Sequence, residues 1–153
     1  MRIIAIIAAC AAWMCVDCNA HAGEILAKCR SIAEPIVIIA VEEHVPVLLL
    51  TALLFSESSC DPNKINSISG AVGAGQVLPS GAGAGYTTKQ LRDPWLNIIL
   101  SAQHLSKWHR RCHSWLGAVT VYHGNERCSA KSSYAKGIIR MWKKLEHESE
   151  PRT

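Results

Sequence analysis

Residues 47–58 read VLLLTALLFSES, and this apolar run that ends in a carboxyl group sets the architecture of the 153-residue chain. Val45-Pro46 stands at its start, where proline is a common helix-opening residue. Val47, Leu50 and Leu54 then recur at the spacing of one helical face. The sequence therefore predicts an apolar helix through Phe55, with Glu57 at its C-terminal end.

The position of Glu57 is unusual for a glutamate. The preceding side chains place its carboxyl group against hydrophobic surface, and the carbonyl end of a helix is unfavourable for an anion. Both effects raise a carboxyl pKa, and a carboxyl group that stays protonated near neutral pH suits a general acid at a glycosidic oxygen. The alternative is an ordinary solvated glutamate at a helix end.

Other parts of the chain also carry helical signals, and none shows β alternation over a useful length. Helices are predicted over Pro35–His44, from Asp93-Pro94 to about Trp108, over Ser114–Tyr122, and onward from about Tyr134. The length suits one domain rather than two. We therefore expect a single compact domain that is mainly α-helical.

A long irregular segment follows the apolar helix. It is rich in serine and asparagine from Ser56 to Ser69, and then in glycine from Gly70 to Gly85. Loops of this length in a compact domain are usually functional or disordered, and the interspersed Val72, Val77 and Leu78 favour a packed loop. Within it, Gly81 to Gly85 is predicted to be a flexible spacer.

The N-terminus resembles a secretion signal. An uncharged apolar stretch, Ile3 to Val16, follows Arg2 and leads to the small-x-small site Ala20-His21-Ala22. We expect a signal peptide over residues 1–22 and a mature domain over residues 23–153, exported to the periplasm or beyond. The apolar stretch is shorter than the roughly 18–20 residues of a membrane-spanning helix, so an uncleaved anchor is the weaker alternative.

Charge and cysteine content restrict the possible partners. Residues 1–22 hold one basic and one acidic residue, so the mature chain keeps a formal net charge of +4. This mild charge suits an anionic cell wall and lacks the basic, aromatic-interleaved stripe typical of nucleic-acid binding. Four cysteines remain after processing, which allows three disulfide pairings in an oxidising compartment. Helix geometry favours Cys29 with Cys60, at the ends of a helical hairpin, and Cys112 with Cys128.

Four short blocks stand in a characteristic order. They are Glu57-Ser58, GAVGAGQVLP at 70–79, Asp93-Pro94 with Asn97-Ile98, and Val121-Tyr122-His123-Gly124. Together they resemble the catalytic domain of the soluble lytic transglycosylases over about residues 36–145, and four blocks in order are more specific than any one. The resemblance implies a lysozyme-like helical fold, with the glycine-rich segment as a cleft loop, and a peptidoglycan substrate.

The resemblance also implies individual roles. Glu57 would protonate the oxygen between N-acetylmuramic acid and N-acetylglucosamine, then accept the proton of the sugar's C6 hydroxyl, which gives a 1,6-anhydromuramoyl end. Ser58 would hydrogen-bond near the reacting sugar, Gln76 would hold the cleft loop and contact substrate, and the Tyr122 hydroxyl would be directed towards Glu57 or the sugar. The remaining predicted substrate contacts are Gly73 and His123. Tyr134 would be structural.

This sequence departs from the family pattern at two places. Ala74 and Gly75 replace a Leu-Met pair that lines the sugar groove, and His123 replaces an asparagine. These changes leave open a non-catalytic wall-binding module of a secretion, conjugation or phage apparatus. Peptidoglycan strands are the expected binding partner, and a secretion, conjugation or phage apparatus is a second possible partner.

A second carboxyl group is not obvious in the sequence. Ordinary glycosidases use two, but Asp61 is better explained as a loop cap and Asp93 as a helix cap. Attack by the sugar's own hydroxyl would replace the missing carboxylate. If Asp61 or Glu126 reaches the cleft, however, the enzyme is a hydrolytic muramidase.

One further cluster contains His109, Cys112 and His113. The two histidines stand four residues apart and would share a helix face if the helix continued through them. A zinc site needs further ligands, and the exported setting favours disulfides. We therefore expect neither a metal nor a cofactor.

Overall fold

The computed structural model describes residues 20–125, 127–129 and 131–150. Within these ranges the chain is helical and confirms the predicted fold class, with β structure limited to isolated bridges at Ile65–Val72 and Val72–Val77. The helices are α2 (Ala20–Cys29), the 3-10 turn η1 (Arg30–Ile32), α3 (Ala33–Glu42), α4 (Val47–Ser58), α5 (Thr88–Leu91), α6 (Pro94–Cys112), α7 (Trp115–Tyr122) and α8 (Ser133–Ser149).

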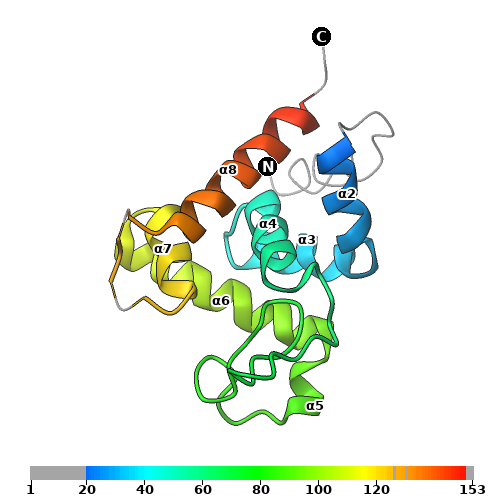
Figure 1. The fold of residues 1–153 in the computed structure, drawn as a ribbon, viewed down its shortest axis with the longest axis vertical. Helices are drawn as coiled ribbons and strands as arrows, with labels where there is room; N and C mark the ends of the chain where they lie inside the picture. Colours follow the sequence, from blue (N-terminus) through cyan, green and yellow to red (C-terminus); the bar gives the residue numbers. More distant parts are fainter. Residues whose placement is uncertain (1–19, 126, 130, 151–153) are drawn as a thin grey trace.

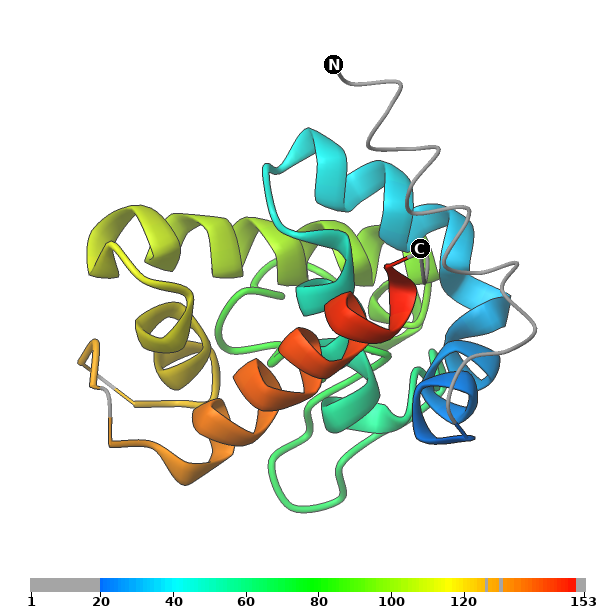
Figure 2. The same cartoon turned by 90° about the horizontal axis from the view of Figure 1, so that it is seen from above.

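Helix α4 occupies the middle of the molecule (Figures 1 and 2). It packs against α2, α3 and α8, and its residues 49–54 are all buried. A helix that is apolar on every side needs neighbours on every side, which explains why α4 became the centre of the core. The core cluster extends from α4 into α2, α3, α6, α7 and α8. These six helices form what we call the helical frame.

The ends of the frame helices largely agree with the predictions. Helix α4 begins directly after Pro46, and Asp93 caps α6, where its Oδ1 accepts from the Leu96 amide at 2.9 Å. Helix α6 continues past the predicted end near Trp108, to Cys112, and His113 closes it in the left-handed conformation. Helix α2 was not predicted, although buried Ala22, Ile25 and Cys29 recur at helical spacing in it.

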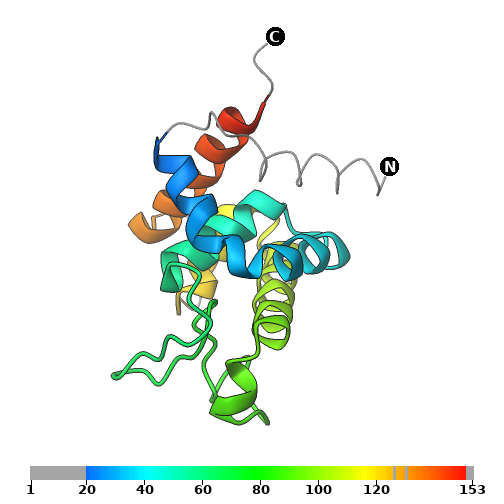
Figure 3. The same cartoon turned by 90° about the vertical axis from the view of Figure 1, so that its right-hand side faces the viewer.

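Residues 59–87 form the cleft loop, which with α5 lies at one end of the molecule, below the helices (Figures 1 and 3). A small core separate from that of the frame joins the loop to α5 and consists of Val72, Val77 and Leu91. The predicted spacer over residues 81–85 is instead folded into turns, in which Gly83 donates to Leu78 O at 3.0 Å. Gly83 is buried, and a Cβ there would come within 2.9 Å of Leu91 Cδ1.

Two disulfides have the pairing that helix geometry favoured. Cys29 at the end of α2 is joined to Cys60 just after α4, with a Cα–Cα distance of 5.0 Å. Cys112 at the end of α6 is joined to Cys128 before α8, with a Cα–Cα distance of 5.4 Å. The first bridge therefore fixes the start of the cleft loop to the frame.

Residues 1–19, most of the predicted signal peptide, lie outside the described ranges. Within the described ranges, none of the helices combines the length and the hydropathy that spanning a bilayer requires.

Candidate active site

Glu57 is the penultimate residue of α4, at the boundary between the frame and the cleft loop. The chain turns away from the helix at Ser59 and Cys60, which both have positive φ. The Glu57 side chain is half-buried, and the Tyr134 hydroxyl donates a hydrogen bond to its Oε1.

The environment of Glu57 changes its acidity as the sequence suggested. Burial raises the pKa of the Glu57 carboxyl, and the Tyr134 hydrogen bond and the nearby charge of His123 oppose this rise without cancelling it. Desolvation favours the neutral acid because a carboxylate loses its hydration there. The site therefore holds a carboxyl group that gives up its proton at a higher pH than an exposed glutamate.

The structure exchanges the roles predicted for Tyr134 and Tyr122, because Tyr134 is the tyrosine that contacts Glu57. It lies in the first turn of α8, and its ring stacks on the His123 ring with centroids 3.7 Å apart. The structural role expected for Tyr134 is therefore incomplete, because its hydroxyl contacts the carboxyl group directly. The sequence held no local signal for this contact, which joins residues 77 positions apart.

Tyr122 lies at the end of α7 and is directed to the cleft loop rather than to Glu57. Its hydroxyl donates to Gly75 O at 2.7 Å, whereas the prediction directed that hydroxyl to Glu57 or the sugar. Burial first, and then the charge of Glu57, raise the pKa of the Tyr122 phenol, while a hydrogen bond with Ser101 lowers it. The net rise keeps the phenol protonated as a hydrogen-bond donor.

Asn97 joins the loop to α6 through three buried hydrogen bonds. Its Oδ1 accepts from the Gly75 amide at 2.8 Å, and its Nδ2 donates to Val72 O at 2.9 Å and to Leu91 O at 2.8 Å. A Cβ at Gly73 would lie 2.3 Å from Asn97 Nδ2, and Gly73 also has positive φ, so glycine is required there. Asn97 belongs to the third of the four sequence blocks, but the sequence alone predicts no contact for its side chain.

Ser58 and Gln76 also hold the loop. The Ser58 hydroxyl donates to Ala74 O at 2.8 Å and accepts from the Asp61 amide at 3.0 Å. The Gln76 side chain donates from Nε2 to Gly73 O at 3.0 Å. With these bonds the two residues position the loop beside Glu57, and their direct contact with substrate stays a prediction.

The expected candidates for a second carboxyl group have other partners or fall outside the described residues. Asp61 is exposed and its Oδ1 accepts from the Asn63 amide at 2.8 Å, which is a local turn. Asp93 caps α6, and Glu126 is not among the described residues. His109 stacks on Trp115, and no described group of three or more His, Cys, Asp or Glu residues is placed to hold a metal.

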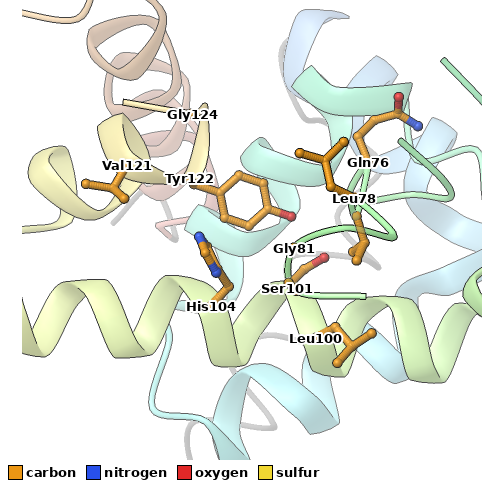
Figure 4. Close-up of a pocket in the computed structure, with 11 residues that line it drawn as sticks. Gln76, Leu78, Gly81, Leu100, Ser101, His104, Val121, Tyr122 and Gly124 are labelled. Atoms are coloured by element: carbon orange, nitrogen blue, oxygen red, sulfur yellow. The ribbon is translucent and has the colours of Figure 1, made fainter. Parts of the chain in front are cut away.

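A recess of about 180 Å³ lies beside this site, between the loop, α6 and α7 (Figure 4). Tyr122 lines it, and the charge of Glu57 influences the Tyr122 phenol, so this ring connects the recess with the carboxyl site. Glu57 itself is not a lining residue. The residues around the recess are Gln76, Val77, Leu78, Gly81, Ala82, Leu100, Ser101, His104, Val121, Tyr122 and Gly124.

Comparison with known proteins supplies the family. The search of curated proteins found no match. Residues 34–151, from α3 to beyond the end of α8, match the family described as the transglycosylase SLT domain. The match contains Glu57, Asn97, Tyr122 and Tyr134, and it agrees with the helical, lysozyme-like architecture. This chain therefore belongs to the transglycosylase SLT domain family, the lysozyme-like catalytic domains of lytic transglycosylases that act on peptidoglycan.

Proposed function

We propose that this chain is a lytic transglycosylase that cleaves the β-1,4 bond between N-acetylmuramic acid and N-acetylglucosamine, with Glu57 as its proton-transferring group. The supporting observation is the half-buried Glu57 carboxyl, whose pKa is raised by burial and whose Oε1 accepts from Tyr134. A general acid of this kind needs a proton available near the pH of its reaction.

In the first step, the protonated Glu57 carboxyl transfers its proton to the glycosidic oxygen as the bond from that oxygen to muramic acid C1 breaks. Positive charge develops at C1, and Glu57 becomes a carboxylate. The Tyr134 hydroxyl stabilises this carboxylate because a hydrogen bond to the ionised form is stronger than one to the neutral form.

In the second step, the C6 hydroxyl of the same sugar attacks C1, and the Glu57 carboxylate accepts the hydroxyl proton. The product is a 1,6-anhydro ring, no water is consumed, and Glu57 returns to its protonated state. Because the nucleophile belongs to the substrate, it is already close to C1 and needs no second carboxylate. A neighbouring carboxylate would raise the pKa of Glu57, and among the described residues the rise comes from burial, while the side chains that act on this pKa are Tyr134 and His123.

Of the remaining residues of the predicted site, Ser58, Gln76 and Tyr122 hold the loop by hydrogen bonds, and Gly73 lies within it. Contact of these residues and of His123 with substrate remains part of the proposal. Residues 1–22 remain a proposed signal peptide, which would bring the enzyme to peptidoglycan outside the cytoplasm. The family match gives no support to a secretion, conjugation or phage apparatus, so the proposed partner is the glycan strand alone.

Mass spectrometry of digested peptidoglycan sacculi tests the proposal. We expect wild-type protein to release 1,6-anhydromuramoyl ends, which are one water lighter than reducing ends. Glu57→Gln should lower the turnover about 10²- to 10⁴-fold. Glu42→Gln, at an exposed glutamate near the end of α3, is the matched control and should keep full turnover.

Three outcomes would contradict the proposal. Reducing ends from wild-type protein would show a hydrolytic muramidase. Full turnover by Glu57→Gln would show that another group is the acid. Binding to sacculi without turnover by wild-type protein would show a non-catalytic module.

A further inference from the structure

Two histidine rings in this protein stack face to face on an aromatic side chain. His109 stacks on Trp115 with ring centroids 3.6 Å apart and 9° between the ring planes, and His123 stacks on Tyr134 at 3.7 Å and 14°. The two stacks are alike in geometry, but the second includes the tyrosine whose hydroxyl donates to Glu57 Oε1. His123 is therefore one side chain away from the carboxyl group.

The second stack joins the end of α7 to the first turn of α8, and the backbone of both helices is fixed there. His123 caps α7, where its backbone N–H donates to Val119 O at 3.2 Å. Ser132 caps α8 with its side chain. Between the two helices, the Thr120 hydroxyl donates to Ser129 O at 2.8 Å. The protein's own backbone contacts therefore bring the two rings together without a bound ligand.

The stack restricts the orientation of the tyrosine side chain. A tyrosine ring turns about two side-chain bonds, and its hydroxyl reaches a given carboxyl oxygen in few of the resulting orientations. Contact between aromatic faces is attractive beyond the area that it buries. His123 therefore favours the orientation in which the Tyr134 hydroxyl reaches Glu57 Oε1.

His123 also acts on Glu57 through its charge. Burial raises the pKa of the Glu57 carboxyl, and the Tyr134 hydrogen bond and then the charge of His123 lower it. Burial, and then the charge of Glu57, raise the pKa of the Tyr134 phenol, so this side chain stays a protonated donor. Tyr122 stays protonated for the same reasons. Of these titratable neighbours, His123 is the one that can place a positive charge near the carboxylate.

Position 123 is one of the two places where this sequence departs from the family pattern, which has an asparagine there. An asparagine side chain has no aromatic ring and carries no charge, so it would supply neither the stack nor the electrostatic effect. The substitution therefore gives this chain a contact with Tyr134 that the family residue cannot form.

We propose that His123 is a positioning residue of the reaction: its ring holds the Tyr134 hydroxyl on Glu57, and its protonated form stabilises the carboxylate that Glu57 becomes in the first step. This inference rests on the proposed function for the reaction itself. His123 gives no proton to the sugar and takes none from it, and it acts through Tyr134 and Glu57. Its charge is effective because a half-buried carboxylate is screened less by water than an exposed one.

Two substitutions separate the ring from the charge. His123→Phe keeps a ring for the stack and removes the charge, so the alkaline limb of the pH profile of turnover should move to higher pH. His123→Asn removes both, so the limb should move further. It should also lower kcat about tenfold with KM nearly unchanged, because Tyr134 is no longer held. The loss of kcat in His123→Phe should be smaller than in His123→Asn.

Carbon NMR of protein with isotopically labelled glutamate carboxyl groups follows Glu57 without turnover, and the Glu57→Gln protein assigns the resonance. We expect the Glu57 titration to move to higher pH in both His123 variants, and further in His123→Asn. The matched control is His109→Asn, which removes the same kind of stack from Trp115. It should leave the titration, kcat and the pH profile like those of wild type.

Three results would overturn the inference. The first is a Glu57 titration that stays in place in both folded His123 variants. The second is a rise in KM with kcat and the pH profile unchanged, which would make His123 a substrate contact. The third is an equal change in His109→Asn, which would show a general effect of losing a ring stack.

The proposed function has a separate readout in the products of digestion. If the Glu57 titration moves in the His123 variants while wild-type protein releases no anhydro ends, the coupling of His123 to Glu57 stands and the proposed reaction fails. If anhydro ends form and the titration does not move, the reaction stands and the positioning role fails.

Discussion

The helical frame and the cleft loop are held together by different forces. In the frame, α4 buries residues 49–54 against α2, α3 and α8, and apolar contact provides most of the stability. Among the described residues of the loop, Val72 and Val77 form a small core with Leu91 of α5, and the chain is positioned by amides and hydroxyls such as those of Asn97 and Ser58. The frame therefore carries the folding energy, and the loop depends on hydrogen bonds for its shape.

Glu57 lies where the two regions meet, and this location explains its properties. The frame supplies the burial that raises its pKa and the Tyr134 hydroxyl that contacts it. The loop supplies the wall beside it through Ala74 and Gly75, which Ser58 and Tyr122 hold. Substitutions in the frame should therefore change mainly stability, and substitutions at the joints of the loop should change activity as well.

The largest expected effect on stability is in the frame. Leu53→Ala removes a fully buried side chain from α4 and should lower the free energy of unfolding by about 2–5 kcal/mol, with little change in turnover per folded molecule. Urea unfolding followed by circular dichroism measures this change. Ile38→Ala, at a side chain that is 38 % exposed on α3, is the control and should cost much less. Equal costs at the two positions would contradict the assignment of folding energy to the α4 core.

The next largest effect should occur at the joint between the loop and α6. Asn97→Ala leaves Val72 O, Leu91 O and the Gly75 amide without their partner, which should cost about 1–3 kcal/mol and lower turnover because the wall at Gly73–Gly75 shifts. Unfolding and sacculus digestion are measured on the same preparation. Asn97→Asp keeps the acceptor for Gly75 but replaces the donor to both carbonyls, so it should also be impaired. Normal turnover with lowered stability would show that Asn97 contributes to stability alone, as the residues of the frame do.

A smaller effect is expected at Tyr134. Tyr134→Phe removes the hydrogen bond that lowers the pKa of Glu57. The ionised carboxylate should lose about 1 kcal/mol of stabilisation. The pKa of Glu57 should rise further, and the alkaline limb of the pH profile of turnover should move to higher pH because the acid keeps its proton longer. Tyr86→Phe, at an exposed tyrosine in the loop, is the control. If the alkaline limb of the Tyr134→Phe profile stays in place, Tyr134 does not influence the proton transfer by Glu57.

The smallest effect concerns stability and pH at Glu57 itself. Its folded-state pKa is raised above the ordinary value of 4.5, so in the window from 4.5 upward to the folded pKa the folded state binds more protons than the unfolded state. Wild-type stability therefore falls as pH rises through this window. Glu57→Gln removes this fall, so the variant should gain stability relative to wild type as pH increases. Thermal unfolding at several pH values checks this, and parallel curves would contradict the raised pKa.

Much of the frame could be predicted because its signals are local. The helices around Val47–Phe55, Pro94–Trp108, Ser114–Tyr122 and Tyr134 onward follow from periodicity and capping residues close in sequence. Helix α5 was missed although Thr87 and Gln90 form a capping box, a pattern visible in the sequence. Helix α2 was missed although most of it follows the predicted signal peptide, because its apolar repeat at Ala22, Ile25 and Cys29 is short.

The loop and the site were harder to predict because their partners are distant in sequence. The turns of residues 81–85 depend on Leu91, which packs beneath Gly83. Asn97 contacts Gly75 across 22 residues and Val72 across 25. These contacts form only when α6 lies beside the loop. Hydrophobic periodicity predicts the helix but not its position relative to the loop.

From the residues alone follow the helical class, the terminal position of Glu57 on an apolar helix, and the preference for the two disulfides now present. Each depends on interactions within one helix or one hairpin. Only the tertiary structure decided that Tyr134 contacts the Glu57 carboxyl group, that Tyr122 donates to the loop, and that His104 lines the recess. The reason is that such contacts depend on how the helices cross, and crossing geometry comes from packing of the whole core rather than from any single segment.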